Sequence, residues 1–279
     1  MQKLTTTVIK RGLSTFLSCL ISFASTAQKL PAVQQISLRT PENLRIDGKA
    51  TEWSNKFQAY NSRTDFYYTI ANNDNNLYVI IQAPAPEIIR RIINGGISLT
   101  INKSGKKKDR EGPSITYPIF DRSNKLGVSF KNMPVIKPGV AATVMSADSF
   151  MNVTNRTMAA KSKLIMVTGV KDLDTLISVY NTDGIRAVAL FDNKLVYTLE
   201  LSISLKQLEL SVNNPVKFSY QLMINEVVPN NANTFAEGLA ISSDITARVA
   251  KMTSSGPPKR PEPSQAATYF WGEYTLVKK

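Results

Sequence analysis

The chain has 279 residues, of which 43% are hydrophobic and 20% are charged, with 34 Lys and Arg against 21 Asp and Glu. This composition is too hydrophobic and too mixed in charge for a disordered chain, and the length suits one large domain or two small ones. The sequence contains no histidine and a single cysteine. Because imidazole is absent, a Ser-His-Asp triad, a Cys-His pair, His-ligated zinc and His-ligated haem are all excluded.

The first 27 residues have the features of a secretory signal peptide. They carry three basic residues and no acidic one, followed by an apolar stretch at 13–24 that is shorter than the roughly 20 residues of a membrane span. Small residues at 25–27 predict cleavage between Ala27 and Gln28. A short amphipathic helix of the folded protein is the alternative interpretation.

Removal of residues 1–27 leaves 252 residues with a net charge of +10 and no cysteine, because Cys19 lies in the removed part. The apolar run before Cys19 is too short for a good lipoprotein signal. We therefore expect an exported protein, whether periplasmic, secreted or associated with the outer membrane, that folds without disulfides. We expect no transmembrane segment in it.

Residues 28–279 are predicted to form one domain built mainly from short strands. Apolar and polar residues alternate at 66–70 and 97–102, and a further strand is expected at 77–82. The Asn-rich link 72–76 predicts a hairpin turn, because Asn and Asp tolerate left-handed backbone. Between these strands, Pro86 and the Gly95-Gly96 pair bound one short helix.

Beyond residue 103 the pattern first weakens and then returns. The stretch 121–161 has little periodicity, so we expect long loops around short strands there. Further strands are predicted at 164–170, 174–180, 185–191, 195–203, 218–224 and 269–277. Many strands, little helix and no alternation of strand and helix indicate an all-β fold, an antiparallel β-sandwich with one or two short helices.

The order of several short motifs resembles family 9 carbohydrate-binding modules. These motifs are Ile46-Asp47-Gly48 with Glu52-Trp53, then Asn76-Leu77-Tyr78-Val79, then the strand and short helix expected at 197–208, and finally Tyr269-Phe270-Trp271-Gly272-Glu273-Tyr274. Ser204 stands where the family usually has proline. The resemblance implies a β-sandwich of the DOMON-like class, and the closing strand is also similar to that of exported Bacteroidetes proteins.

Family 9 modules hold a sugar ring between two exposed tryptophans, with structural calcium nearby. This chain has only two tryptophans, Trp53 and Trp271. Both lie in the motifs that mark the fold, as do Asp47 and Gly48. We therefore expect the two tryptophans to pack in the core or at its rim and not to hold a sugar ring. Haem-binding relatives use Met and His ligands, which a chain without histidine cannot supply. We expect no cofactor and no metal site, since the Asn-rich link offers only Asp74 as a carboxylate.

A basic loop is the most distinctive candidate for ligand binding. It contains Lys106, Lys107, Lys108 and Arg110. Such a loop suits acidic glycans, lipid head groups or an acidic partner protein, and its alternative role is a solubilising hairpin tip. Nucleic acid is not an expected partner, because the loop lacks interleaved aromatic residues and a recognised reader fold.

Catalysis is not expected. Two carboxylates can hydrolyse a glycoside without histidine, but no pair is distinguished by its setting. Glu200 lies in the outward-facing register of its strand, and Asp47 lies in a turn where it bonds to backbone. We therefore expect a noncatalytic binding module for carbohydrate or another envelope polymer. The alternative is a structural or protein-interaction component of the cell envelope.

Overall fold

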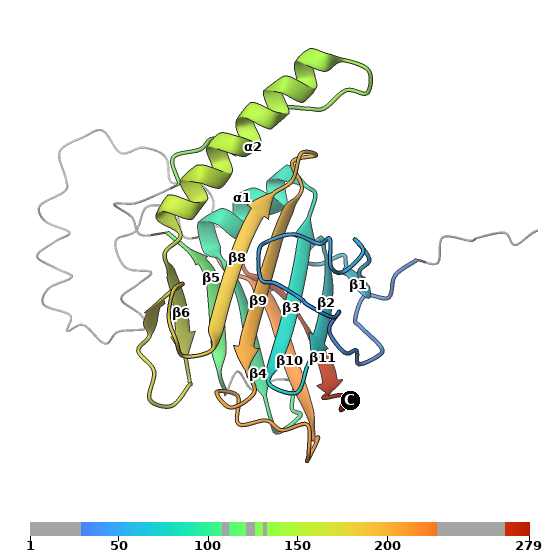
Figure 1. Cartoon of the computed structure of the whole chain (residues 1–279), viewed down its shortest axis with the longest axis vertical. Coiled ribbons are helices and arrows are strands. Elements are labelled where there is room, and N and C mark those ends of the chain that lie inside the picture. Colours follow the sequence, from blue (N-terminus) through green and yellow to red (C-terminus); the bar gives the residue numbers. More distant parts are fainter. Residues whose placement is uncertain (1–28, 108–111, 121–125, 131–132, 228–265) are drawn as a thin grey trace, which may run out of the picture.

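The computed structural model describes residues 29–107, 112–120, 126–130, 133–227 and 266–279 (Figure 1). The predicted signal peptide, Lys108 and Arg110 lie outside these ranges. The described residues form eleven strands and two helices. The strands are β1 Ala59–Asn61, β2 Phe66–Asn72, β3 Asn76–Ala83, β4 Ile97–Asn102, β5 Ser114–Ile119, β6 Leu164–Thr168, β7 Leu176–Ser178, β8 Ile185–Phe191, β9 Tyr197–Ser204, β10 Lys217–Ile224 and β11 Thr268–Thr275.

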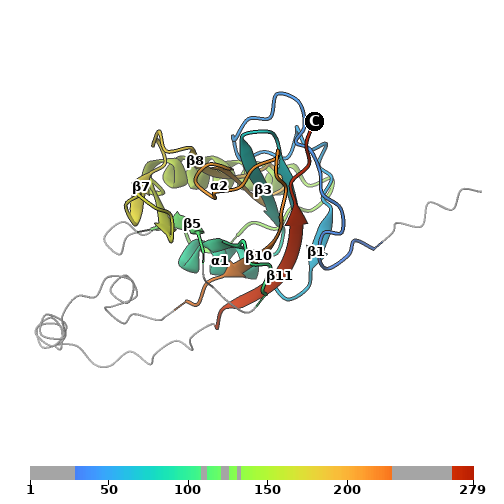
Figure 2. The same cartoon turned by 90° about the horizontal axis from the view of Figure 1, so that it is seen from below.

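The strands form two antiparallel sheets packed face to face, which confirms the predicted β-sandwich (Figures 1 and 2). The five-stranded sheet has the order β1-β2-β3-β9-β8, and the six-stranded sheet has the order β11-β10-β4-β5-β6-β7. The Asn-rich link joins β2 to β3 as predicted, with Asn72 paired to Leu77. Within that link the Asn73 side chain accepts hydrogen bonds from the backbone N–H groups of Asn75 and Asn76.

The core lies between the two sheets and follows from the alternation of side chains along each strand. In β9, Tyr197, Leu199, Leu201 and Ile203 point inward and are buried. Burying a large apolar side chain contributes roughly 1.5–3 kcal/mol, so these inward rows supply most of the driving force for the fold. The Tyr68 and Tyr220 hydroxyls meet across the core at 2.9 Å, which joins the two sheets.

Helix α1, Pro86–Gly95, occupies the stretch where the sequence predicts a helix. Proline stands at its start, Glu87 lies in its first turn, and Gly96 ends it with a positive φ of 73°. Ile89, Ile92 and Ile93 are buried, and the helix contacts β3, β5 and β10, so it covers one end of the core.

The prediction of loops and short strands at 121–161 is wrong for most of that stretch. Residues Ala141–Lys161 form helix α2, which is 21 residues long and contacts β8 (Figure 1). Its apolar residues are spread around the helix and only Ala147, Thr154 and Met158 are buried. Because little of the helix packs against the sandwich, its sequence lacks the one-sided apolar stripe that predicts a helix.

A second, smaller core covers the outer face of the five-stranded sheet. Here residues 38–57, which we call the strap, pass over β2 and β3. The buried members of this core are Ala50, Trp53, Ala71, Tyr78 and Ile80. The strap is tied down by a bridge between Arg39 and Asn72. Its position creates a hollow on this face of the sheet.

Candidate functional site

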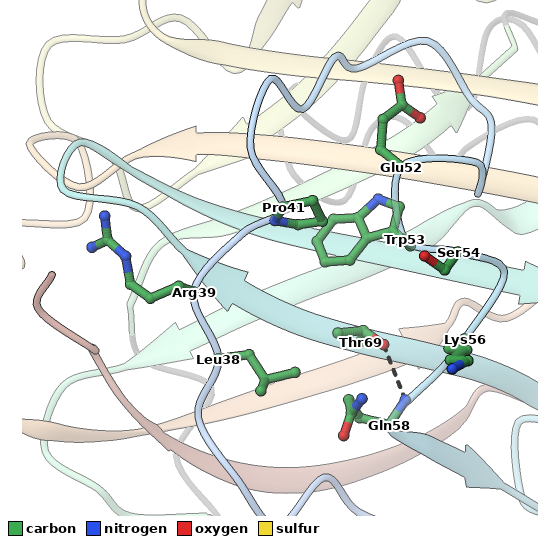
Figure 3. Close-up of a pocket in the computed structure, with 9 residues that line it drawn as sticks. All are labelled: Leu38, Arg39, Pro41, Glu52, Trp53, Ser54, Lys56, Gln58 and Thr69. Carbon is green, nitrogen blue, oxygen red and sulfur yellow. Dashed lines mark hydrogen bonds between the residues drawn. The ribbon is translucent and has the colours of Figure 1, made fainter.

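A groove of about 360 Å³ lies between the strap and β2 (Figure 3). It is lined by Leu38, Arg39, Pro41, Glu52, Trp53, Ser54, Lys56, Gln58 and Thr69. All of these except Thr69 come from the strap or the residue that follows it. The shape of the groove therefore depends on the contacts that hold the strap in place on the sheet.

Trp53 forms part of the groove wall and also fastens the strap. Only 8% of its surface is exposed, and its indole Nε1–H donates a hydrogen bond of 2.9 Å to Oε1 of Glu200. The ring packs in the smaller core against β2 and β3. Trp53 therefore packs, as the sequence predicts, and leaves little of its ring open to a ligand.

Glu200 accepts three hydrogen bonds from the strap. Its Oε2 accepts hydrogen bonds from the backbone N–H groups of Asp47 and Gly48, both at 2.9 Å. With the bond from Trp53, three donors meet one carboxylate that is only 1% exposed. Burial raises the pKa of Glu200, and the three hydrogen bonds oppose that rise.

The outer face of β9 at Glu200 is not open to solvent. The residue faces away from the main core, as its register predicts, but it is buried because the strap covers it. Asp47 does bond to backbone, since its Oδ1 accepts from the Lys49 N–H at 3.0 Å. Gly48 has a φ of 80° and lies against Leu190, so a side chain there would be strained.

Charged side chains border the groove on more than one side. Arg39 donates to Oδ1 of Asp74 at 2.6 Å and to the Val277 carbonyl at 3.0 Å, and it holds the pKa of Asp74 below its usual range. Lys56 is exposed, and no interaction within the described ranges engages its ammonium group. The Gln58 backbone N–H donates to Thr69 Oγ1 at 3.0 Å, which fixes the end of the strap (Figure 3).

The two tryptophans do not face each other. Trp271 lies on β11 between the inward-facing Phe270 and Gly272, so it points to the outer side of the six-stranded sheet, opposite Gln221 in register. Trp53 lies on the outer side of the five-stranded sheet. Because the whole sandwich separates them, they cannot hold one sugar ring between them. The packing role expected of Trp271 stays a prediction.

Two of the four residues of the predicted basic patch lie in the described ranges. Lys107 pairs with Glu273 at 3.0 Å, and Glu273 also pairs with Lys217 at 3.1 Å. These two lysines lower the pKa of Glu273. Lys106 is exposed beside them. Lys106 and Lys107, the described residues of the patch, therefore belong to a surface of mixed charge beside the start of β10, and this surface is not uniformly basic.

The described residues contain no cluster of acidic or thiol side chains that could hold a metal ion. In the same ranges, no helix combines the length and apolar character needed to cross a bilayer. No protein-family model and no curated protein matches the chain. The structure defines the class as an antiparallel β-sandwich with a strap over one outer sheet face. The resemblance to family 9 carbohydrate-binding modules stays a prediction.

Proposed function

We propose that the protein is a noncatalytic binding module of the cell envelope that takes a carbohydrate ligand in the groove beneath the strap. The observation that carries this proposal is the pairing of an apolar wall with a polar border. Leu38, Pro41 and Trp53 supply the apolar part. Sugar rings offer apolar C–H surfaces and hydroxyl groups together, so a small groove of this mixed character suits them.

The charges around the groove favour an acidic carbohydrate. Arg39 and Lys56 line it with Glu52 as the one acidic lining residue. The cation of Arg39 is shared with Asp74, whereas Lys56 is exposed. An ammonium group at the border would attract a carboxylated sugar of an envelope polymer more than a neutral one.

The hydrogen bonding of Glu200 supports a noncatalytic role. A glycosidase needs two carboxylates that reach the scissile bond. Here both oxygens of Glu200 accept N–H groups of the protein, and the residue is buried under the strap. The Glu200 carboxylate behind Trp53 is therefore engaged in holding the fold, and Glu52 is the one acidic side chain that lines the groove.

The test is titration of the protein with acidic and neutral polysaccharides, carried out at low and high salt. Lys56→Ala and Gln58→Ala should each weaken binding to an acidic polysaccharide several-fold. Lys194→Ala, which removes an exposed lysine in the turn between β8 and β9, is the matched control and should bind normally. Absence of binding to every glycan, or equal loss in the control, would refute the proposal.

The alternative is a protein-interaction component, and one feature favours it. Among the described residues, the short strand β7 forms one edge of the six-stranded sheet. Leu176 on β7 and Leu164 on the neighbouring β6 are exposed, and Leu176 lies opposite Met166 in register. Exposed apolar residues at a free edge are typical of strand-mediated association. Leu176→Lys should then abolish capture of a partner and leave glycan binding unchanged.

A further inference from the structure

An aromatic surface adjoins the groove at one of its ends. Lys56, Gln58 and Thr69 lie together at this end (Figure 3). Tyr67 precedes Thr69 by two residues on β2. Because side chains alternate along a strand, Tyr67 projects from the same outer face of the five-stranded sheet, about 7 Å from Thr69. Tyr60 follows Gln58 by two residues, and it lies beside Tyr67 in the register of β1 and β2.

Three aromatic side chains form this surface, which we call the aromatic shelf: Phe57, Tyr60 and Tyr67. Tyr67 is in the middle, with its ring centroid 6.0 Å from that of Phe57 and 4.8 Å from that of Tyr60. All three are half-buried, whereas Phe66 and Tyr68 on either side of Tyr67 are fully buried in the main core. The aromatic shelf therefore belongs to the surface of the molecule and not to the core between the sheets.

Contacts with the fold hold the aromatic shelf in place. The Tyr60 hydroxyl donates a hydrogen bond to the Asp65 carboxylate. Phe57 packs against the smaller core beneath the strap. Tyr67 is paired with Tyr60 on one side and with Gln82 on the other. Rings that are fixed before binding lose little conformational freedom when a ligand stacks on them, which favours affinity.

Hydrogen-bonding and charged groups border the aromatic shelf. Gln82 is half-buried on the same outer face, and its Nε2 donates to Thr198 Oγ1 at 3.2 Å. Its amide oxygen has no donor among the described residues and is an acceptor for a ligand hydroxyl. Arg63 is exposed in the turn between β1 and β2, and no interaction in the described ranges engages its guanidinium group.

A sugar chain that carries carboxylates matches these groups. The apolar C–H face of a sugar ring stacks on aromatic rings, and its hydroxyl groups bond to an amide such as that of Gln82. Lys56 directly precedes Phe57 at the groove, and Arg63 follows Tyr60 by three residues. Two cations on either side of an aromatic shelf favour a ligand with carboxylates on successive sugar units.

We propose that the aromatic shelf is a second sugar subsite, so that the ligand is an acidic oligosaccharide of at least two units and not a single sugar. One unit occupies the groove beside Lys56. The next unit stacks on Tyr67, with its carboxylate toward Arg63 and a hydroxyl group on Gln82. This inference rests on the proposed carbohydrate binding in the groove and adds the length of the ligand to it.

Titration calorimetry of the full chain with oligogalacturonates of defined length tests the second subsite. The monomer fills the groove alone, whereas the tetramer reaches the aromatic shelf as well. Because the second contact is made within one bound molecule, affinity should rise about tenfold or more from the monomer to the tetramer. Oligomers of alginate, which also carry one carboxylate on each unit, provide a second series of probes.

Substitutions in the aromatic shelf should change only the binding of the longer probe. Tyr67→Ala removes the middle ring and should weaken tetramer binding about fivefold, with monomer binding as in the wild type. Tyr67→Phe keeps the ring and should retain most of the tetramer affinity. Tyr180→Ala is the matched control, because it removes a tyrosine that is 74% exposed beside β7 of the other sheet. It should bind both probes normally.

Two further variants keep the test separate from folding defects. Arg63→Ala changes an exposed side chain, so it should weaken tetramer binding several-fold and leave the urea midpoint unchanged. Tyr67→Trp places a fluorescent ring in the middle of the aromatic shelf. The emission that this variant adds to that of the wild type should change when the tetramer binds and stay constant at saturating monomer.

The possible failures are distinguishable. Equal affinity for monomer and tetramer, or full tetramer affinity in Tyr67→Ala and Arg63→Ala, would overturn the second subsite and leave binding in the groove intact. Equal loss of monomer and tetramer binding in Tyr67→Ala would also overturn it, because Tyr67 would then only support the shape of the groove. Absence of binding at every length in both series would refute the proposed function and the second subsite with it.

Discussion

The most informative single change is Glu200→Gln, because it alters one oxygen of the carboxylate that holds the strap. The wild-type carboxylate accepts three N–H donors, from Asp47, Gly48 and Trp53, each at 2.9 Å. A glutamine of the same shape has one carbonyl oxygen and one NH₂ group. Whichever way the amide turns, at least one of the buried donors faces another donor and loses its acceptor.

The expected magnitude follows from the number of donors that lose their partner. A buried polar group without a hydrogen bond costs about 1–3 kcal/mol. If the amide oxygen keeps the two backbone donors, only Trp53 Nε1 is unpaired, so we expect the free energy of unfolding to fall by about 1–3 kcal/mol. Replacing Trp53 by Phe in the Glu200→Gln background should then cost less than it does in the wild type.

Urea unfolding followed by circular dichroism provides the measurement. Glu42→Gln is the matched control, because Glu42 is an exposed carboxylate of the same strap and its change should leave the midpoint in place. If Glu200→Gln unfolded at the wild-type urea concentration, the three hydrogen bonds would not be what fastens the strap. A loss as large in Glu42→Gln would equally refute the reasoning.

Two other results are expected. Because burial raises the pKa of Glu200, the folded state binds the Glu200 proton more tightly than the unfolded state does. This residue therefore makes the free energy of unfolding fall as the pH rises from about pH 4 through the raised pKa. Glu200→Gln should remove this pH dependence in urea titrations carried out at several pH values. Gly272→Ala should destabilise by about 1–3 kcal/mol in thermal unfolding, because a Cβ would lie 2.2 Å from the Tyr220 ring. A wild-type midpoint for that variant would show that Tyr220 can move aside freely.

The sandwich could be predicted because burial on one side of a strand imposes a period of two. The runs at 66–70 and 97–102 show that period, and both became strands of the expected sheets. Helix α2 could not be predicted in the same way. Only a few positions of this helix are buried, so its apolar residues do not recur with the period of a helix.

The candidate site could be predicted only in part. Asp47, Gly48 and Trp53 stand out as a motif along the chain, and the structure places all three around one carboxylate. Glu200 itself follows Trp53 by 147 positions, and nothing in its own strand distinguishes it from an exposed residue. Glu200 stands at a polar position of an alternating strand, between Thr198 and Ser202, and it is buried only because the strap covers that face.

The two ends of the domain are fastened to each other, and this has a consequence for the order in which the fold can form. The Tyr274 hydroxyl donates to the Leu38 carbonyl at 2.8 Å, and Asn72 and Arg39 both donate to the Val277 carbonyl. These contacts join residues more than 200 positions apart. During synthesis the start of the strap must therefore wait for nearly the whole chain to emerge before it can dock, which makes completion of this domain a late event.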